Sequence, residues 1–119
     1  MNSPSPVKQP IVIIGAGPSG SVVAALLHAK GHPVLILEKT QFPRFSIGES
    51  LLPQCMAFIE EAGMMEAVES AVERESFQFK VGAAFARGEQ FGEFDFRDKF
   101  SEGWGTTYQV PRANFDKVL

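Results

Sequence analysis

The sequence is poor in the residues that build disulfides and metal sites. Its 119 residues include one cysteine and two histidines. A single cysteine excludes an internal disulfide and is typical of a reducing compartment. These residues are also too few for a structural zinc site, so we expect no metal site.

Long apolar runs are lacking as well. No apolar stretch approaches the roughly 18 residues that suggest a membrane-spanning helix. The polar, proline-rich start of the chain contains no apolar signal core. We therefore expect a cytoplasmic protein without a membrane span, and we expect residues 1–9 to form a disordered leader.

An excess of charge of one sign is also missing. The sequence has 14 acidic and 11 basic residues, a net charge of −3 and no basic cluster. This balance argues against nucleic acid as a partner. Hydrophobic residues make up 45% and charged residues 21%, close to the globular average. Residues 10–119 are thus long enough for one domain with a modest core.

Two short aliphatic runs flank a glycine-rich turn and a helical pattern. Runs 11–14 and 34–37 are apolar on both faces, which favours buried parallel strands. Residues 21–30 have helical spacing and end at a glycine that suits a C-cap. Parallel strands joined by a helix form a right-handed βαβ unit. The sequence predicts an α/β fold that opens with an incomplete Rossmann-like unit.

Helices are expected after this unit. Residues 40–50 show no periodicity and are predicted to be a loop. Helices are predicted over 51–62, with Ser50 as the N-cap, over 64–72, and over 111–119, with a proline at the first helical position.

An antiparallel hairpin is predicted between the second and third of these helices. Alternating residues indicate a strand over 77–85, a turn at 87–89 and a returning strand that carries Phe94 and Phe96. A further short strand is expected over 106–110. We interpret this part as a sheet on the substrate side of the molecule.

Phenylalanine is abundant, with 11 residues, several of them in the predicted hairpin. One interpretation is that an aromatic face of the sheet packs on the core. The alternative is an aromatic wall of a substrate site.

A glycine motif links the first predicted strand to the first helix. Gly15 allows a tight turn, Gly17 lets a diphosphate approach the backbone, and Gly20 allows close helix–strand packing. The free N–H groups and the dipole at the helix start attract phosphate charge. The motif predicts a dinucleotide site.

Glu38 ends the second predicted strand, 38 − 20 = 18 residues after the last glycine of the motif. This is near the roughly 20-residue separation expected for the acid that binds a ribose hydroxyl. A carboxylate there would repel a 2′-phosphate, which favours FAD or NAD over NADP. The alternative is a plain glycine turn with an ordinary strand-end glutamate.

Further segments resemble one enzyme family. The sequences EK at 38–39, FPRF at 42–45 and IGESLLP at 47–53 resemble the amino-terminal signature of flavin-dependent halogenases. They are also similar to group A-type flavoprotein monooxygenases and geranylgeranyl reductases. The sequence YQVPRANFD at 108–116 resembles a later signature of this superfamily.

The resemblance implies that FAD is the cofactor. The ADP half would lie on the glycine motif and the strand end, and Arg44 and Arg112 would lie against the phosphate and ribityl region, because a guanidinium fork binds phosphate oxygens well. The turn at 48–50 would approach the flavin ring. The expected cofactor-binding residues are Gly15, Ala16, Gly17, Pro18, Ser19, Gly20, Glu38, Lys39, Arg44, Gly48, Glu49, Ser50 and Arg112. A surface ion pair for Arg44 and a simple helix cap for Ser50 are the alternatives.

Lys80 is the one candidate catalytic residue. The sequence FKVGAAF at 79–85 resembles the halogenase strand whose lysine directs hypohalous acid onto the substrate. Strand alternation alone would instead predict a solvated lysine.

The implied activity is an oxidoreductase that uses reduced flavin and oxygen to halogenate or hydroxylate a small organic substrate. A separate flavin reductase or NAD(P)H would supply electrons. The alternatives are reduction of a prenyl double bond and a truncated, non-catalytic dinucleotide-binding or assembly module.

Two family elements are missing from the sequence. It contains no Gly-Asp dipeptide, and its single tryptophan, Trp104, cannot supply a Trp-x-Trp element. We therefore expect the amino-terminal part of a longer flavoprotein, one that is capable of self-association.

Overall fold

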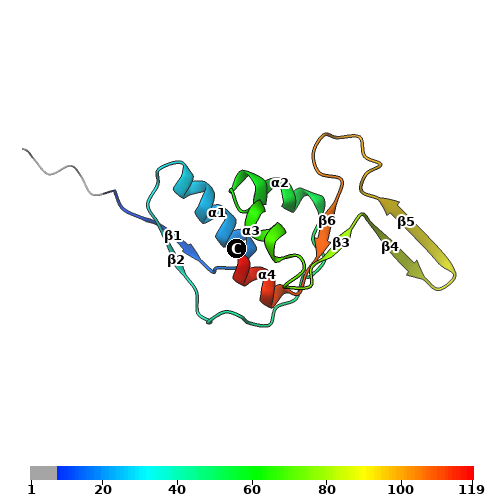
Figure 1. The fold of residues 1–119 in the computed structure, drawn as a ribbon, viewed down its shortest axis with the longest axis horizontal. Coiled ribbons are helices and arrows are strands. Elements are labelled where there is room, and N and C mark those ends of the chain that lie inside the picture. The colour runs from blue at the N-terminus through cyan, green and yellow to red at the C-terminus, as the bar shows by residue number, and fades with distance from the viewer. Residues whose placement is uncertain (1–7) are drawn as a thin grey trace, which may run out of the picture.

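The computed structural model describes residues 8–119, so most of the predicted leader 1–9 lies outside the described residues. Figure 1 shows the arrangement of the elements. The helices are α1 (Pro18–Ala29), α2 (Pro53–Glu61), α3 (Met65–Ala71) and α4 (Arg112–Val118). The strands are β1 (Ile11–Ile14), β2 (Val34–Leu37), β3 (Gln78–Lys80), β4 (Gly82–Arg87), β5 (Gln90–Asp95) and β6 (Thr107–Gln109). Within this part of the chain, no helix is long and apolar enough to cross a membrane.

The predicted βαβ unit is present. β1 and β2 pair in parallel, with Ile11 opposite Val34 at one end and Ile14 opposite Leu37 at the other. Helix α1 begins at Pro18 and not at the predicted residue 21, because the fixed φ of proline suits the first helical position. The unit places the glycine motif at the carboxyl end of β1.

Helix α1 covers one face of the two-stranded sheet. A Cβ on Gly20 of α1 would lie 3.4 Å from the side chain of Ile13, so this face of β1 packs against the helix. Side chains alternate along a strand, so the neighbours of Ile13 point to the opposite face. That face is open to solvent and consists of Val12, Ile14, Leu35 and Leu37.

The core lies between the other three helices. Met56 and Ile59 of α2 and Val68 and Ala71 of α3 stand three residues apart, on one face of each helix, and all are buried. Phe115 of α4 joins them, as does Val110 directly after β6, and Tyr108 of β6 packs against this cluster. Helix α4 and strand β6 therefore belong to the most buried part of the molecule.

The predicted cap of α2 is wrong. Leu52 is the N-cap and Pro53 occupies the first helical position, which moves the helix start past Ser50. Ser50 instead forms an isolated antiparallel bridge with Gln109. Helix α4 likewise begins at Arg112, with the preceding proline as its N-cap.

The predicted strand over 77–85 is also wrong, because the chain changes its pairing partner at Val81. β3 pairs antiparallel with β6, whereas β4 pairs antiparallel with β5. The Phe96 N–H donates to the carbonyl of Val81 at 2.7 Å. A Cβ on Gly82 would lie 2.5 Å from the carbonyl oxygen of Phe94, so only glycine allows this close approach.

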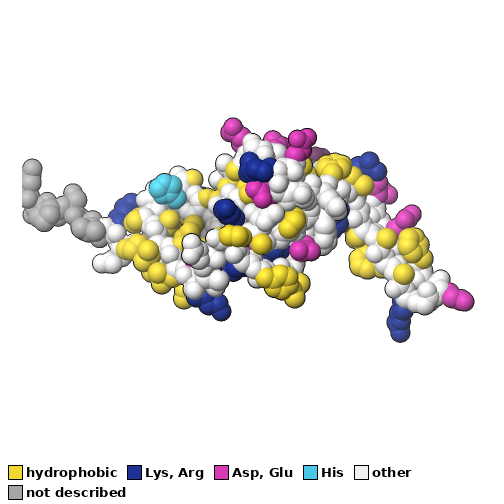
Figure 2. Space-filling view, turned by 60° about the horizontal axis from the view of Figure 1, so that its bottom comes forward, with side chains coloured by type: hydrophobic (Ala, Val, Ile, Leu, Met, Phe, Trp, Pro, Cys, Tyr) yellow, Lys and Arg dark blue, Asp and Glu magenta, His cyan; other side chains and the backbone are white. Residues whose placement is uncertain are grey.

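The β4–β5 hairpin projects as an arm, and hydrophobic side chains gather along it in the space-filling view (Figure 2). Phe77 is buried, and its ring meets the ring of Phe115 with centroids 5.8 Å apart. The phenylalanines of the arm are exposed, so they do not pack on the core as one interpretation predicted. They are Phe85, Phe91 and Phe94.

Candidate functional site

The glycine motif forms the turn between β1 and α1. Gly15 has a φ of +97°, which favours glycine, and its N–H donates to the carbonyl of Leu37 at 2.7 Å. A Cβ on Gly20 would lie 2.0 Å from the carbonyl oxygen of Gly15, so this residue must also be glycine. No side chain caps the start of α1. The first N–H groups of the helix are thus available to an anion.

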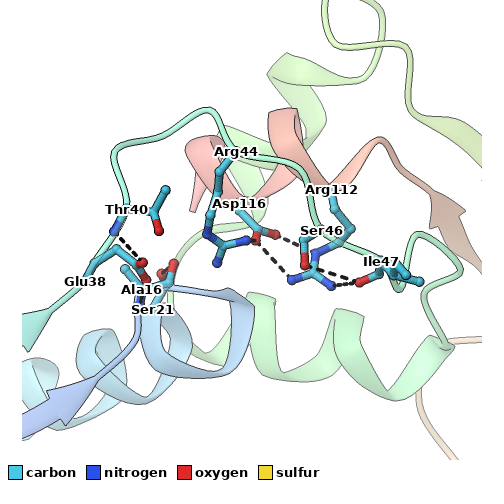
Figure 3. Close-up of polar contacts among 9 residues, drawn as sticks. All are labelled: Ala16, Ser21, Glu38, Thr40, Arg44, Ser46, Ile47, Arg112 and Asp116. Carbon is cyan, nitrogen blue, oxygen red and sulfur yellow. Dashed lines mark hydrogen bonds and ion pairs between the residues drawn. The ribbon is translucent and has the colours of Figure 1, made fainter.

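Glu38 lies beside this turn (Figure 3). Its carboxylate accepts the N–H of Ala16 at 2.9 Å and the N–H of Thr40 at 3.0 Å. The hydrogen bond from Ala16, followed by that from Thr40, lowers the pKa of Glu38 below its ordinary value. Each carboxylate oxygen keeps a second lone pair, which can accept a hydroxyl of a ribose diol.

An open groove of about 610 Å³ runs along the ends of β1 and β2 next to Glu38. Its lining combines aliphatic side chains with the carboxylate of Glu38. Such a surface suits a nucleoside, because the aliphatic side chains can contact the base and the carboxylate can accept hydrogen bonds from the sugar hydroxyls. The lining residues are Ile14, Gly15, Ile36, Leu37, Glu38 and Lys39.

Two arginines share one buried acid on the other side of the glycine turn (Figure 3). Nη1 of Arg44 lies 3.2 Å from Oδ2 of Asp116. Nε and Nη2 of Arg112 donate to the two carboxylate oxygens of Asp116 at 2.7 Å and 3.0 Å. These hydrogen bonds raise the pKa of Arg112. Because an arginine keeps its proton in proteins, the two guanidinium groups are the cations of this cluster.

The two guanidinium groups reach the turn itself. A Cβ built on Gly17 would lie 3.6 Å from Nη2 of Arg44 and 3.9 Å from Nη2 of Arg112. Gly17 is thus bordered by two cations and by the start of α1. This arrangement fits a diphosphate, which carries negative charge and needs close approach to the backbone.

The segment 47–51 is attached to β6 and α4. The Val110 N–H donates to the carbonyl of Glu49 at 2.8 Å, and Nη1 of Arg112 donates to the carbonyl of Ile47 at 2.6 Å. A Cβ on Gly48 would lie 3.0 Å from the same Nη1, and its φ is +98°. Two signatures far apart in the sequence, 47–53 and 108–116, therefore meet in space.

Lys80 contacts the other end of that segment. Its Nζ donates to Oγ of Ser50 at 2.5 Å and to the carbonyl of Leu51 at 3.2 Å, and it lies 5.3 Å from the ring centre of Phe96. Among the described residues, no carboxylate pairs with it. Lys80 is half-buried and does not behave as the solvated lysine that alternation alone predicts.

A cleft of about 750 Å³ opens beside Lys80. Strands β3, β4 and β5 line it, and Phe79 and Phe94 are among its walls. The cleft is therefore where the predicted aromatic wall of a substrate site would lie, and that role stays a prediction. No group of three or more His, Cys, Asp or Glu side chains in residues 8–119 could hold a metal ion.

The structure brings most predicted cofactor residues to one surface. Gly17, Glu38, Arg44 and Arg112 lie around the same turn, and Ser50 joins the segment held by Arg112. Lys39 and Ser19 are exposed and make no side-chain hydrogen bond in the described chain.

The sequence analysis does not identify Asp116 as a site residue. Its spacing of four residues from Arg112 on a helix is nevertheless the signal of an ion pair.

Comparison with known proteins identifies the family. The tryptophan halogenase family model matches residues 10–115. Tryptophan 2-halogenase of Chondromyces crocatus is 38% identical over the whole of this chain, which covers 21% of that protein.

Two solved structures are similar in fold and sequence. A flavoprotein/dehydrogenase from Cytophaga hutchinsonii is 51% identical, with a TM-score of 0.82 over 92% of this chain and 26% of its own. The myxobacterial chondrochloren halogenase CndH, a variant of FAD-dependent halogenases, is 34% identical, with a TM-score of 0.71 over 91% of this chain and 24% of its own. The chain thus spans about a fifth to a quarter of the length of these relatives. The match over residues 10–115 shows that the chain belongs to the tryptophan halogenase family.

Proposed function

We propose that this chain binds FAD and forms the cofactor-binding, amino-terminal part of a flavin-dependent halogenase. The observation that carries the proposal is the turn at Gly17, which is bordered by the guanidinium groups of Arg44 and Arg112 and by the uncapped start of α1. Membership of the tryptophan halogenase family gives this anion site its chemical context.

Each part of the cofactor has a matching group in this proposal. The N–H groups at the start of α1 and the two arginines bind the diphosphate, and Glu38 accepts the hydroxyls of the adenosine ribose. The segment 48–50, attached to β6, borders the flavin ring. Bound FAD, once reduced by a separate flavin reductase or by NAD(P)H, supplies the oxygen chemistry that oxidises halide.

Lys80 is the proposed catalytic residue. Its ammonium lines the cleft next to Phe79 and Phe94, where a small aromatic or other electron-rich substrate would find apolar walls. The three donors of a lysine ammonium exceed the two acceptors that Ser50 and Leu51 provide. The remaining N–H is available to orient hypohalous acid towards the substrate.

FAD uptake tests the binding half of the proposal. We expect the protein expressed from its complete reading frame to purify yellow, or to turn yellow with added FAD, with absorbance near ~450 nm. Arg44→Met and Arg112→Met should each weaken FAD binding, because each removes one phosphate-binding cation. A colourless protein that takes up no FAD would contradict the proposal.

Halide incorporation tests the catalytic half. With a flavin reductase, NADH, bromide and a panel of phenols, indoles and pyrroles, we expect brominated product detected by mass spectrometry. Lys80→Met should retain FAD but lose product by about a hundredfold or more, as expected when a group that transfers or holds a proton is removed. Ser50→Ala should cause a smaller loss, because the carbonyl of Leu51 still holds the ammonium. Undiminished bromination by Lys80→Met would remove Lys80 from the proposal.

A further inference from the structure

Asp116 has an unusual environment for an acidic residue in a small protein. Its side chain is completely buried, in the second turn of α4 next to Phe115. Its two carboxylate oxygens receive three contacts, one from Arg44 and two from Arg112. A buried carboxylate is costly unless cations and hydrogen bonds surround it, so this arrangement depends on both arginines.

The two arginines are held in different ways. Arg112 presents its fork, with Nε and Nη2, to the carboxylate and uses Nη1 for the carbonyl of Ile47. Arg44 touches the carboxylate with Nη1 and rests on the ring of Phe42, 4.8 Å from its centre. Nη2 of Arg44 has no hydrogen-bond partner among the described residues. It is this atom that lies nearest to a Cβ placed on Gly17.

The charge of Asp116 opposes simple attraction of an anion. Two guanidinium groups alone would present a charge of +2 to the turn at Gly17, and the carboxylate reduces it to +1. If the site served only to attract an anion, the acid would weaken it, because it lowers the positive charge at the turn. What the acid contributes is geometry, because it fixes the direction of both guanidinium planes at once.

We propose that Asp116 is a positioning residue of the dinucleotide site, which holds Arg44 and Arg112 so that their free N–H groups face a diphosphate at Gly17. The inference rests on the proposed function, since it assumes that the diphosphate of FAD lies at this turn. Asp116 acts through the two arginines and does not itself touch the cofactor. Through the bond from Arg112 to Ile47, the same carboxylate also fixes the segment that borders the flavin ring.

The effect of Asp116→Asn on FAD affinity distinguishes geometry from charge by its sign. The substitution keeps the size of the side chain and raises the positive charge of the cluster by one. If charge alone mattered, FAD would bind more tightly. We expect it to bind about ten- to a hundredfold more weakly, because the arginines lose hydrogen bonds to a charged acceptor. Titration of flavin fluorescence with the protein expressed from its complete reading frame measures this, and Asp116→Glu should recover part of the loss.

A second measurement separates positioning from a general loss of structure. In a background that already carries Arg44→Met and Arg112→Met, the further change Asp116→Asn should no longer weaken FAD binding and should raise stability, because it removes a buried carboxylate that has lost both of its cations. If the acid only supported the fold, the loss would be the same in both backgrounds. That additive result would overturn the inference.

Lysine substitutions provide a test that leaves Asp116 in place. Arg44→Lys and Arg112→Lys keep the charge but lose the planar fork, so a geometric role predicts weaker FAD binding by about tenfold or more. Equal binding by the lysine variants, or tighter binding by Asp116→Asn, would overturn the inference while the proposed function stands. A wild-type protein that binds neither FAD nor ADP would overturn both.

Discussion

Two glycines of the turn, Gly17 and Gly20, differ in whether the fold leaves room for a side chain. This difference separates a role in folding from the proposed role in binding. Gly17 has φ −71° and ψ −179°, a conformation open to any residue, and a Cβ there would make only ordinary contacts with the two arginines. Gly20 has no such freedom, since its Cβ would collide with the backbone of Gly15. Gly17 is therefore free of structural demands, and in the proposed function its lack of a side chain leaves room for the diphosphate.

A matched pair of alanine substitutions tests this distinction. Gly17→Ala should change the free energy of unfolding by about 1 kcal/mol or less, as for other exchanges at an N-cap. It should weaken FAD binding by about tenfold or more, because the methyl group occupies the approach of the diphosphate. Gly20→Ala should instead destabilise the fold by about 1–3 kcal/mol, as in overpacking. Thermal unfolding and FAD titration measure the two effects, and unimpaired binding by Gly17→Ala would contradict the placement of the diphosphate.

The ionisation of Glu38 predicts how FAD affinity depends on pH. Hydrogen bonds from Ala16 and Thr40 lower its pKa in the folded protein, so it stays ionised below the ordinary glutamate pKa of about 4.3. Its contribution to stability, and in the proposed function to ribose binding, is thus fully present above that ordinary value. The contribution is lost only as the pH falls through the lowered pKa.

We expect the ratio of FAD affinities between wild type and Glu38→Gln to be about tenfold and constant from about pH 8 to about pH 5. Glu89→Gln, which removes an acid from the distant hairpin turn, is the control for net charge and should bind FAD as wild type does. A ratio that already shrinks between neutral pH and pH 5 would mean that the pKa of Glu38 is raised, contrary to the hydrogen bonds in the structure.

At the scale of elements, the sequence predicts best where local chemistry decides the structure. The βαβ unit is specified by two aliphatic runs and by glycines with defined steric roles, and the structure confirms it. Glu38 directly follows β2, as its position after the second aliphatic run predicts. These features depend on neighbouring residues, so a pattern within a short window contains them.

Features that depend on distant partners were predicted wrongly or not at all. The alternation over 77–85 continues without a break in the sequence. The segment is divided at Val81 only because its first half pairs with β6 and its second half with β5. Ser50 resembles a cap by its position, but Gln109 and Lys80 engage it instead. The contact of Arg44 with Asp116 joins the loop after β2 to the last helix. No local pattern encodes such contacts.

The β4–β5 hairpin should be the least stable element of the described chain. A two-stranded hairpin is at best marginally stable by itself, and most residues of this one are exposed. Helix α3, by contrast, contributes Val68 and Ala71 to the centre of the core. We expect amide hydrogen exchange to be much faster in β4 and β5 than in α3, because small local openings release hairpin amides. Equal protection would show that another surface covers the arm in solution.

The molecule as a whole exposes more surface than a compact protein of its size. Its accessible area is 8734 Å², against about 6,300 Å² expected for a folded monomer of 13.0 kDa. Part of the excess comes from the projecting hairpin, and part from the β1–β2 end, where Figure 2 shows hydrophobic side chains together.

The open face of the β1–β2 sheet is the most apolar of these surfaces. Val12 and Leu35 are register partners on this face, as are Ile14 and Leu37, and their exposed fractions are 51%, 46%, 89% and 50% in that order. Two-stranded sheets with an uncovered aliphatic face and free edges pair readily with other chains. We therefore expect the 119-residue chain to self-associate at micromolar concentrations.

Sedimentation velocity over a range of concentrations measures this association. Val12→Lys combined with Leu35→Glu should shift the chain towards monomer, because the two opposite charges make the face polar while remaining paired across the strands. Both positions lie away from Glu38, so FAD binding should persist and report an intact fold. Phe85→Lys with Phe91→Glu makes the same exchange on the hairpin arm and serves as the matched control. If the hairpin variant alone restores the monomer, the arm and not the parallel sheet is the surface through which copies meet.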